Sequence, residues 1–132
     1  MNKATSLFLI STCLTLLSFS VSAEDQGKLK WCENATITGT VQKSTVTHPM
    51  NRSKFVVFTL SLKQPVDIAA AECEGSKVAK ANTKEVQVKD EQSVLNKYVG
   101  KTITVSGLLM FPDNAYDVRP AILYPPITVT TE

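Results

Sequence analysis

Two stretches of this chain repeat one short pattern, in which apolar residues alternate with threonine or serine and a glycine closes the run. The first is Ala35-Thr-Ile-Thr-Gly-Thr-Val41, and the second is Thr102-Ile-Thr-Val-Ser-Gly-Leu108. Successive side chains of a β-strand point to opposite faces, so this period of two is typical of half-buried strands. The pattern predicts two similar strands. It places Gly39 and Gly107 where strands bend or where two backbones approach closely.

Further strands are predicted around this pair. A strand over 55–62 begins with apolar residues on both faces and is expected to be central, with an inward set made of Val56, Phe58, Leu60 and Leu62. A short alternating strand is expected over 85–88. The last strand, over 118–129, contains three prolines, which predicts an edge position or a bulge.

One helix and several loops complete the predicted order. Asp90 places an acidic side chain at the start of a helix, and Gly100 ends it. Segments 43–54 and 74–83 are rich in polar residues and are expected to be loops, with a turn at 63–65.

The resulting order is strand, strand, short strand, helix, strand, strand. It is the order of the OB-fold, a five-stranded Greek-key barrel with one short helix between strands three and four. In such a barrel the two repeated strands are neighbours, and Tyr98 and Val99 would close one end. The alternative is a small β-sandwich.

Three segments resemble an uncharacterised family of exported bacterial domains with an OB-like pattern. They are Phe58-Thr-Leu-Ser-Leu-Lys-Gln-Pro-Val66, Tyr98-Val-Gly-Lys-Thr-Ile-Thr-Val-Ser-Gly-Leu-Leu109 and Arg119-Pro-Ala-Ile-Leu123. The resemblance spans about 37–129, and its most specific part is the Val-Gly-Lys-x-x-x-Val-x-Gly run. More distantly, the chain is similar to the periplasmic bacterial OB-fold proteins. The family's His- and Thr-rich loop between the last two strands is replaced here by 111–119, so no metal or polar site is carried over to that loop.

The first 23 residues have the pattern of a cleaved signal peptide. Lys3 is followed by an apolar run over 7–21 and by the small-x-small site Val21-Ser-Ala23. This apolar run is shorter than a membrane-spanning helix, which needs about 20 residues. We therefore expect a signal peptide at 1–23, an N-terminal arm at 24–34 and one domain at 35–132. The protein would be periplasmic or secreted, without stable membrane insertion after cleavage.

Two cysteines follow the predicted cleavage site, Cys32 and Cys73. In an oxidising compartment a single pair favours one intramolecular disulfide. It closes a loop of 73 − 32 = 41 positions, for which chain entropy gives about 4 kcal/mol. Trp31 is expected to pack beside it.

No motif for catalysis or for metal binding is present in the sequence. The only histidine, His48, lies in a Thr-His-Pro turn with no acidic neighbour and is expected on a surface loop. Adjacent carboxylates occur only at 24–25 and 90–91, and no phosphate loop or zinc spacing occurs. We therefore expect a protein that is not an enzyme, with no cofactor and no metal.

The candidate site residues are three residues of the 111–119 loop and one of the second strand. Phe111, Tyr116 and Arg119 are of the types enriched at interfaces, and Phe55 is expected to be exposed because its parity is opposite to that of Phe58. The chain has fourteen basic and twelve acidic residues, and thirteen and twelve once Lys3 is removed with the signal peptide. This near-neutral charge does not favour binding to nucleic acid. Two hypotheses remain, an adaptor or inhibitor that binds a protein partner through its loops, and a barrel that binds a small ligand or an envelope oligosaccharide. A loop that only caps the barrel is the alternative to a site at 111–119.

Overall fold

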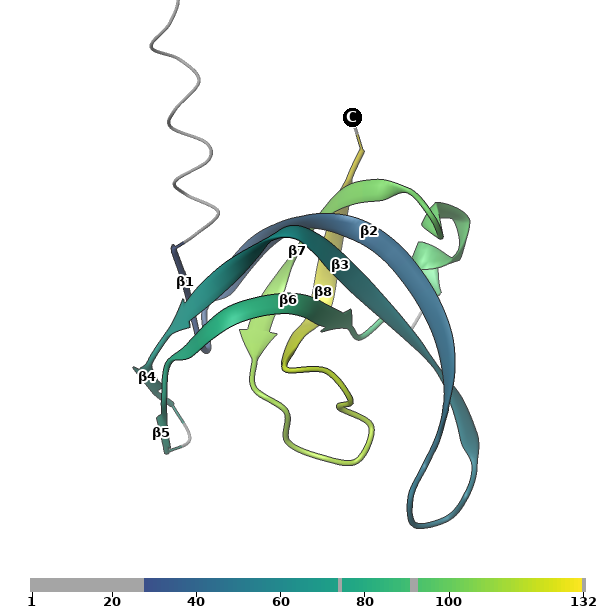
Figure 1. The fold of residues 1–132 in the computed structure, drawn as a ribbon, viewed down its shortest axis with the longest axis horizontal. Coiled ribbons are helices and arrows are strands. Elements are labelled where there is room, and N and C mark those ends of the chain that lie inside the picture. The colour runs from purple at the N-terminus through teal and green to yellow at the C-terminus, as the bar shows by residue number, and fades with distance from the viewer. Residues whose placement is uncertain (1–27, 74, 91–92, 132) are drawn as a thin grey trace, which may run out of the picture.

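The computed structural model describes residues 28–73, 75–90 and 93–131, and Figure 1 shows its fold. The predicted signal peptide and the start of the predicted arm lie outside the described residues. The described chain is mostly β, as predicted. Its elements are β1 (Lys28–Lys30), β2 (Asn34–Thr47), β3 (Lys54–Ala69), β4 (Ala71–Glu72), β5 (Ser76–Lys77), β6 (Lys80–Val88), the 3-10 helix η3 (Val94–Tyr98), β7 (Thr102–Met110) and β8 (Ala121–Thr130).

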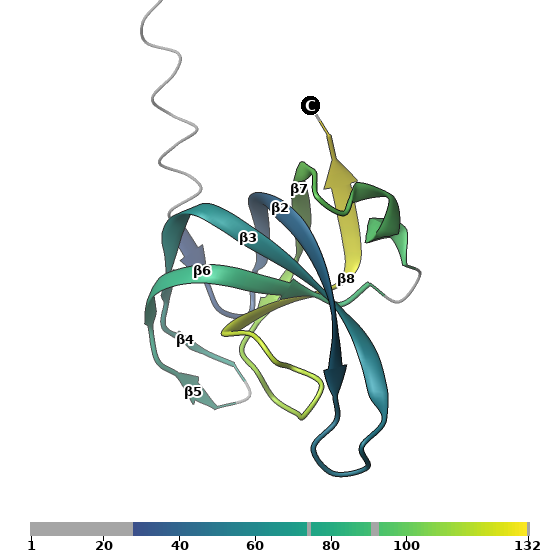
Figure 2. The ribbon, with the colours of Figure 1, turned by 45° about the vertical axis from the view of Figure 1, so that its right-hand side comes forward.

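Six strands form one mixed sheet in the order β1-β3-β2-β7-β8-β6, and β6 also pairs with β3. The pairings therefore run in a circuit from β3 through β2, β7, β8 and β6 back to β3. Pairs β1–β3 and β6–β8 are parallel, and the other pairs of this sheet are antiparallel. Figures 1 and 2 show β2 and β3 as long, strongly curved strands. The short β4–β5 hairpin forms a separate sheet.

The two repeats pair with each other, as the sequence predicts. Ala35 lies opposite Gly107 and Gly39 lies opposite Ile103 in the antiparallel β2–β7 register. The threonine face of this pair carries three side-chain hydrogen bonds across the strands. They join Thr36 to Ser106 (2.8 Å), Thr38 to Thr104 (2.7 Å) and Thr40 to Thr102 (3.0 Å).

Both glycines of the repeats lie where backbones approach closely, which confirms their predicted role. A Cβ on Gly39 would lie 2.9 Å from the Ser61 carbonyl oxygen, and one on Gly107 would lie 2.9 Å from that of Tyr124. The register between β7 and β8 also shifts between Ser106 and Leu108. Neither position has room for a side chain.

The buried core lies inside the circuit of strands. Phe58, Leu60 and Leu62 are buried as predicted, but Val56 is 50% exposed. The prediction for Val56 is wrong because the pairing of β3 with β6 ends at Phe58–Val88, two residues before Val56 would be covered.

Two predicted breaks in the strands are wrong. β2 continues to Thr47 and β3 begins at Lys54, so the predicted loop at 43–54 shrinks to 48–53. Residues 43–47 are mostly polar, yet they form a strand because they pair in register with residues 54–58. The predicted turn at 63–65 is likewise part of β3, where a register shift between Ser61 and Val66 accommodates Pro65.

Strand structure also extends into the predicted N-terminal arm and the predicted loop at 74–83. The arm holds β1, and the loop holds β5 and the start of β6.

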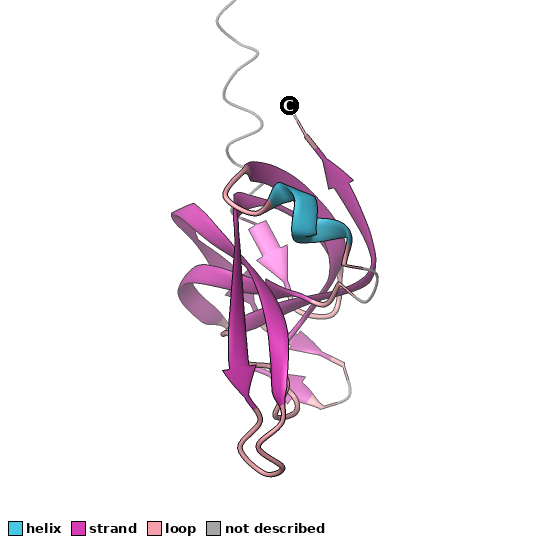
Figure 3. Ribbon diagram, turned by 90° about the vertical axis from the view of Figure 1, so that its right-hand side faces the viewer, coloured by secondary structure: helices cyan, strands magenta, loops and turns pink. Residues whose placement is uncertain are grey.

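The predicted α-helix is a 3-10 helix of five residues, η3, which Figure 3 shows over one end of the sheet. The segment is too short for a stable α-helix, and 3-10 turns are common as connectors. The Leu95 N–H donates to Asp90 Oδ2 (2.6 Å), and Leu95 is fully buried. Leu95 thus joins the buried core and Tyr98 packs against it partly buried, whereas Val99 is 43% exposed, so the expectation that Val99 packs inside is wrong. Among the described residues, no helix is long and apolar enough to cross a membrane.

Replacing Gly107 with alanine tests the close approach of β7 and β8. We expect Gly107→Ala to lower the free energy of unfolding by about 1–3 kcal/mol, because the new methyl group meets backbone that cannot move aside. Urea denaturation measures the effect. Ser106→Ala, which removes only the hydroxyl contact with Thr36, is the control, and an equal loss in both variants would contradict the steric argument.

Candidate functional site

The loop between β7 and β8, residues 111–120, folds back over β3 and β6 (Figures 1 and 2). Gln87 on β6 is 3% exposed and holds it with two hydrogen bonds. Its Nε2 donates to the Tyr116 carbonyl oxygen (2.9 Å), and its Oε1 accepts from the Val118 N–H (2.8 Å). Arg119 Nε donates to Thr59 Oγ1 (3.2 Å) on β3. The loop is therefore fixed to the sheet by side chains of both strands.

A buried carboxylate organises the tip of the same loop. Asp117 Oδ2 accepts from the backbone N–H of Asp113 (2.7 Å) and of Asn114 (3.3 Å). Its Oδ1 lies 2.7 Å from Lys89 Nζ, and the Asp117 side chain has no exposed surface. A buried charge needs such a partner, so the ion pair ties the loop to the end of β6.

Tyr124 on β8 completes this polar cluster. Its hydroxyl donates to Asp117 Oδ2 at 3.4 Å. Burial raises the pKa of the Tyr124 hydroxyl above the ordinary value of 10.0, and the charges of Asp117 and Asp113 and the hydrogen bond to Asp117 raise it further. The fold thus favours the neutral phenol.

Three aromatic rings meet where the loop reaches the β2–β3 hairpin. The Tyr116 ring lies 4.9 Å from that of Phe55 and 4.7 Å from that of His48, between ring centroids. His48 is buried, not exposed as predicted, because its ring packs against Tyr116, with the Phe55 ring centroid 6.4 Å away. Its Nδ1 also accepts from the Met50 N–H (3.1 Å), which stabilises the hairpin turn.

A groove of about 480 Å³ opens beside these rings. Phe58 and Val88 form its buried floor, and Tyr116 and Val56 are exposed at its rim. The volume falls within the roughly 300–1,000 Å³ of small-molecule sites. The full lining is Lys43, Phe55, Val56, Phe58, Gln87, Val88, Lys89, Asp90, Ser93, Asn96, Asn114, Tyr116, Tyr124 and Pro125. We call this the aromatic groove.

The four predicted site residues do not form one site. Tyr116 and Phe55 meet in the aromatic groove, although Phe55 is half-buried. Phe111 packs instead against Trp31, with ring centroids 6.1 Å apart, and Lys77 Nζ lies 3.7 Å from its ring centroid. Arg119 points to the sheet, toward Thr59 and Glu85, and holds the loop in place.

The sequence did not reveal Lys43, Asn96 and Tyr124 as groove residues. Lys43 Nζ donates to Asn96 Oδ1 (2.9 Å) across 53 positions of sequence. A separation of this length leaves no local pattern, and only the predicted strand pairing would bring these residues together.

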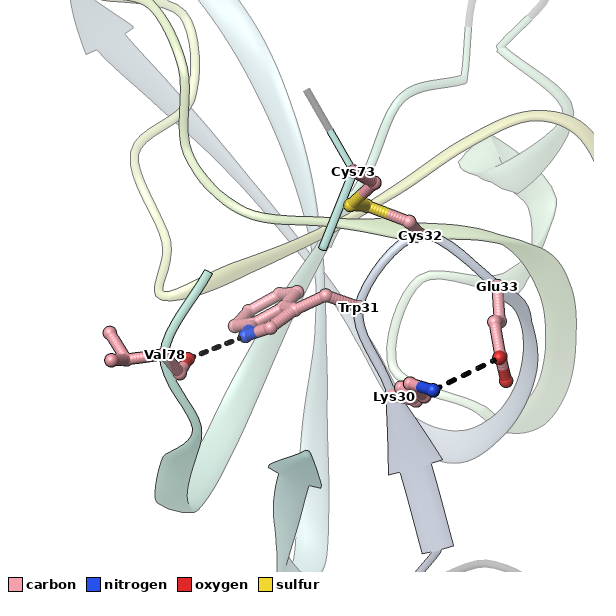
Figure 4. Close-up of a disulfide and its surroundings, with 6 residues drawn as sticks. All are labelled: Lys30, Trp31, Cys32, Glu33, Cys73 and Val78. Atoms are coloured by element: carbon pink, nitrogen blue, oxygen red, sulfur yellow. Dashed lines mark hydrogen bonds and ion pairs between the residues drawn. A yellow bond between two sulfur atoms is a disulfide. The ribbon is translucent and has the colours of Figure 1, made fainter. Parts of the chain in front are cut away.

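The predicted disulfide joins Cys32 and Cys73, whose Cα atoms are 6.5 Å apart (Figure 4). As expected, Trp31 packs beside it, and the Trp31 indole N–H donates to the Val78 carbonyl oxygen (2.9 Å). The disulfide and this hydrogen bond link the segment that contains β4 and β5 to the residues that follow β1. They lie at a second, smaller cavity of about 270 Å³ that Phe111 and Trp31 line, apart from the aromatic groove.

The described residues hold no group of three or more His, Cys, Asp or Glu side chains placed to bind a metal ion. The carboxylates at the groove already have partners, since Asp90 caps Leu95 and Asp117 pairs with Lys89. The groove therefore offers aromatic surface, amides and ammonium groups, which suit binding.

No protein-family model matches the chain, and a search of curated proteins finds no significant match.

Replacing Gln87 with leucine tests how the loop is held. We expect Gln87→Leu to lower the free energy of unfolding by about 1–3 kcal/mol, because the Tyr116 carbonyl and the Val118 N–H lose their partner. Urea denaturation of this variant is compared with that of Gln42→Leu, a change at an exposed position of β2. Equal stability of the two variants would show that Gln87 does not anchor the loop.

Titration of Tyr124 tests the polar cluster. Its raised pKa means that the fold stabilises the neutral phenol, so this contribution is complete below pH 10.0 and is lost as the pH rises through the folded pKa. We expect a tyrosinate absorbance transition above pH 10.0 that Tyr124→Phe removes. The unfolding free energy of the wild type should also fall more steeply above that pH than that of the variant. A Tyr124→Phe protein with an unchanged absorbance titration would contradict the assignment.

Proposed function

We propose that this chain is an exported, non-catalytic binding module of the bacterial envelope that holds a partner protein at the aromatic groove. The observation that carries the proposal is Tyr116. This ring is 42% exposed, yet it stands on a loop fixed by Gln87 and Asp117. Exposed aromatic side chains on a rigid support are the residues that most often dominate binding energy.

The strand order supports an OB-fold as the finer description of the sheet. The chain order of that fold, three strands, a helix and two strands, is matched by β2, β3, β6, η3, β7 and β8. In addition, β6 pairs with β3, which completes the circuit of strands. On this description the groove lies between the loop that joins the first two strands and the loop that joins the last two. These loops are where OB-folds commonly bind. The resemblance to exported OB-like bacterial domains points the same way.

Two features support the proposed location. Residues 1–23 have the pattern of a signal peptide, and a disulfide suits an oxidising compartment. In the periplasm, the role of an adaptor or inhibitor of a secreted enzyme would fit a small domain whose sequence carries no catalytic motif.

A second candidate is the binding of a small ligand or an envelope oligosaccharide. The groove volume of about 480 Å³ favours it, together with the amides of Asn96 and Asn114 beside aromatic rings. Amide groups hydrogen-bond hydroxyl groups, and aromatic rings cover apolar faces.

Substitution of Tyr116 tests both candidates. The bait is the oxidised protein, cross-linked to its partners in an envelope extract, and the affinity of each purified partner is then measured. We expect Tyr116→Ser to weaken binding by about tenfold or more, the loss typical of an interface hot spot. The matched control is Val78→Ser, at a residue 84% exposed and outside the groove lining. Equal binding by both variants would sink the proposal, and binding to a glycan array without a protein partner would favour the second candidate.

A further inference from the structure

We propose that the aromatic groove binds its partner as an added β-strand, by backbone hydrogen bonds to the open edge of β3 at residues 54–57. This inference rests on the proposed function and names the mode of binding and the chemistry of the partner. The partner is an extended segment of another protein that alternates apolar and acidic residues.

The open edge exists because β6 is shorter than β3 at this end. β3 starts at Lys54 and pairs with β2 from there onward, with Lys54 opposite Thr47. Its pairing with β6 reaches only Phe58, opposite Val88. Residues 54–57 therefore have a strand neighbour on the β2 side alone. Beyond Val88 the chain turns toward β8, where the Lys89 N–H donates to the Leu123 carbonyl oxygen (2.9 Å).

The hairpin shows which backbone groups face this edge. The His48 N–H donates to the Ser53 carbonyl oxygen (2.7 Å), so this opposing pair is hydrogen-bonded. Hydrogen-bonded and non-hydrogen-bonded pairs alternate along antiparallel strands. The pairs Thr47–Lys54 and Thr45–Val56 are therefore non-hydrogen-bonded, and the N–H and C=O groups of Lys54 and Val56 point away from β2.

Val41 provides an independent check of this parity. Val41 lies opposite Leu60 in the β2–β3 register. Leu60 is four positions after Val56, so the backbone groups of these two β3 residues point to the same side of the strand. As the alternation requires, the Val41 backbone groups point away from β3. Its N–H donates to the Lys101 carbonyl oxygen (2.9 Å), and its carbonyl oxygen accepts from the Gly100 N–H (2.8 Å).

The two strand edges that flank the groove differ in their protection. β8 also leaves β6 after Leu123, but its next residues include Pro125 and Pro126, which have no N–H to donate. Proline is a common device against unwanted pairing at an edge. The β3 edge contains Lys54-Phe-Val-Val57, without proline, and Val56 is 50% exposed. Of the two edges that flank the groove, the β3 edge is thus the one whose residues all keep a backbone N–H.

The charges at the groove define the partner. Lys43 Nζ lies 6.0 Å from the Phe58 ring centroid. Lys89 Nζ lies 5.8 Å from that of Tyr124, but its charge is already paired with Asp117 Oδ1. Lys54 adds a third cation at the start of the edge. Among the lining residues the acid is Asp90, whose Oδ2 already accepts from the Leu95 N–H. An alternating strand of about four residues, roughly 13 Å long, would bring acidic side chains to Lys43 and Lys54 and apolar ones to the rings.

Selection from a random eight-residue peptide library against the oxidised protein provides the probe. We expect the selected peptides to alternate apolar and acidic residues. We also expect Val56→Pro to weaken the tightest of them by about tenfold or more, because this substitution removes the edge N–H while sparing the β2 ladder. Val56→Ala, which shortens the same side chain but keeps the N–H, is the matched comparison, and Val56→Pro should bind about tenfold more weakly than Val56→Ala.

A second measurement does not depend on how well Val56→Pro folds. The selected peptide is synthesised with N-methyl groups on alternate residues, in both registers, and tested on the wild-type protein. One register should lose binding and the other should keep it, and the bound peptide should slow hydrogen exchange at the Val56 amide. Equal binding of both registers, or selection of basic peptides or of none, would overturn the inference. If the binding of the selected peptides is lost in Tyr116→Ser but kept in Val56→Pro, the inference is overturned and the proposed function stands. If binding is kept in both variants, the proposed function is overturned as well.

Discussion

The double pairing of β3 is the constraint on which the rest of this structure depends. Over residues 58–61 the strand pairs with β2 on one side and with β6 on the other. The β3–β6 pairing, which continues with register shifts as far as Ile68, turns the sheet into a circuit and encloses Leu60, which has no exposed surface. Where this pairing ends at Phe58, the interior opens, and the aromatic groove begins there. The core and the candidate site are thus two consequences of the length of β6.

The opposite seam, between β2 and β7, supplies the curvature that the circuit needs. Strands that close on themselves bend strongly, and backbones meet at the corners. Gly39 and Gly107 allow those approaches, while the threonine hydroxyls bond across the strands on the other face. A repeated sequence pattern on paired strands therefore serves one geometric purpose, with apolar residues and a glycine inward and hydrogen-bonding residues outward.

The sequence predicted what depends on local periodicity. The period of two located parts of β2, β3, β6 and β7, the last strand was predicted around β8, and the two cysteines after the predicted signal peptide indicated the disulfide. It failed where tertiary contacts override local pattern. Residues 43–47 look polar and loop-like, yet they form a strand because 54–58 pair with them. His48 looks like a surface residue, yet Phe55 and Tyr116 bury its ring.

The candidate site was less predictable than the fold. Tyr116 and Phe55 were expected as binding residues on the basis of residue type and parity, and the structure brings them together. Residue type gave no reason to separate Phe111 and Arg119 from them. That separation comes from Gln87 and Asp117, which set the path of the loop and direct Phe111 toward Trp31. A buried amide on a strand and a buried acid in a loop carry no sequence signal until the strands are paired.

The contact between Tyr116 and Phe55 also links the loop to the strand edge. Phe55 is the residue before Val56, and its ring centroid lies 4.9 Å from that of Tyr116. The loop is fixed to β3 and β6. The contact between Tyr116 and Phe55 therefore fixes the position of the β2–β3 hairpin end relative to this loop. An edge held in this way loses little conformational freedom when a strand is added, which favours binding. In the proposed mode of binding, Tyr116 would contribute in two ways, as exposed surface for the partner and as a support for the edge that the partner would extend.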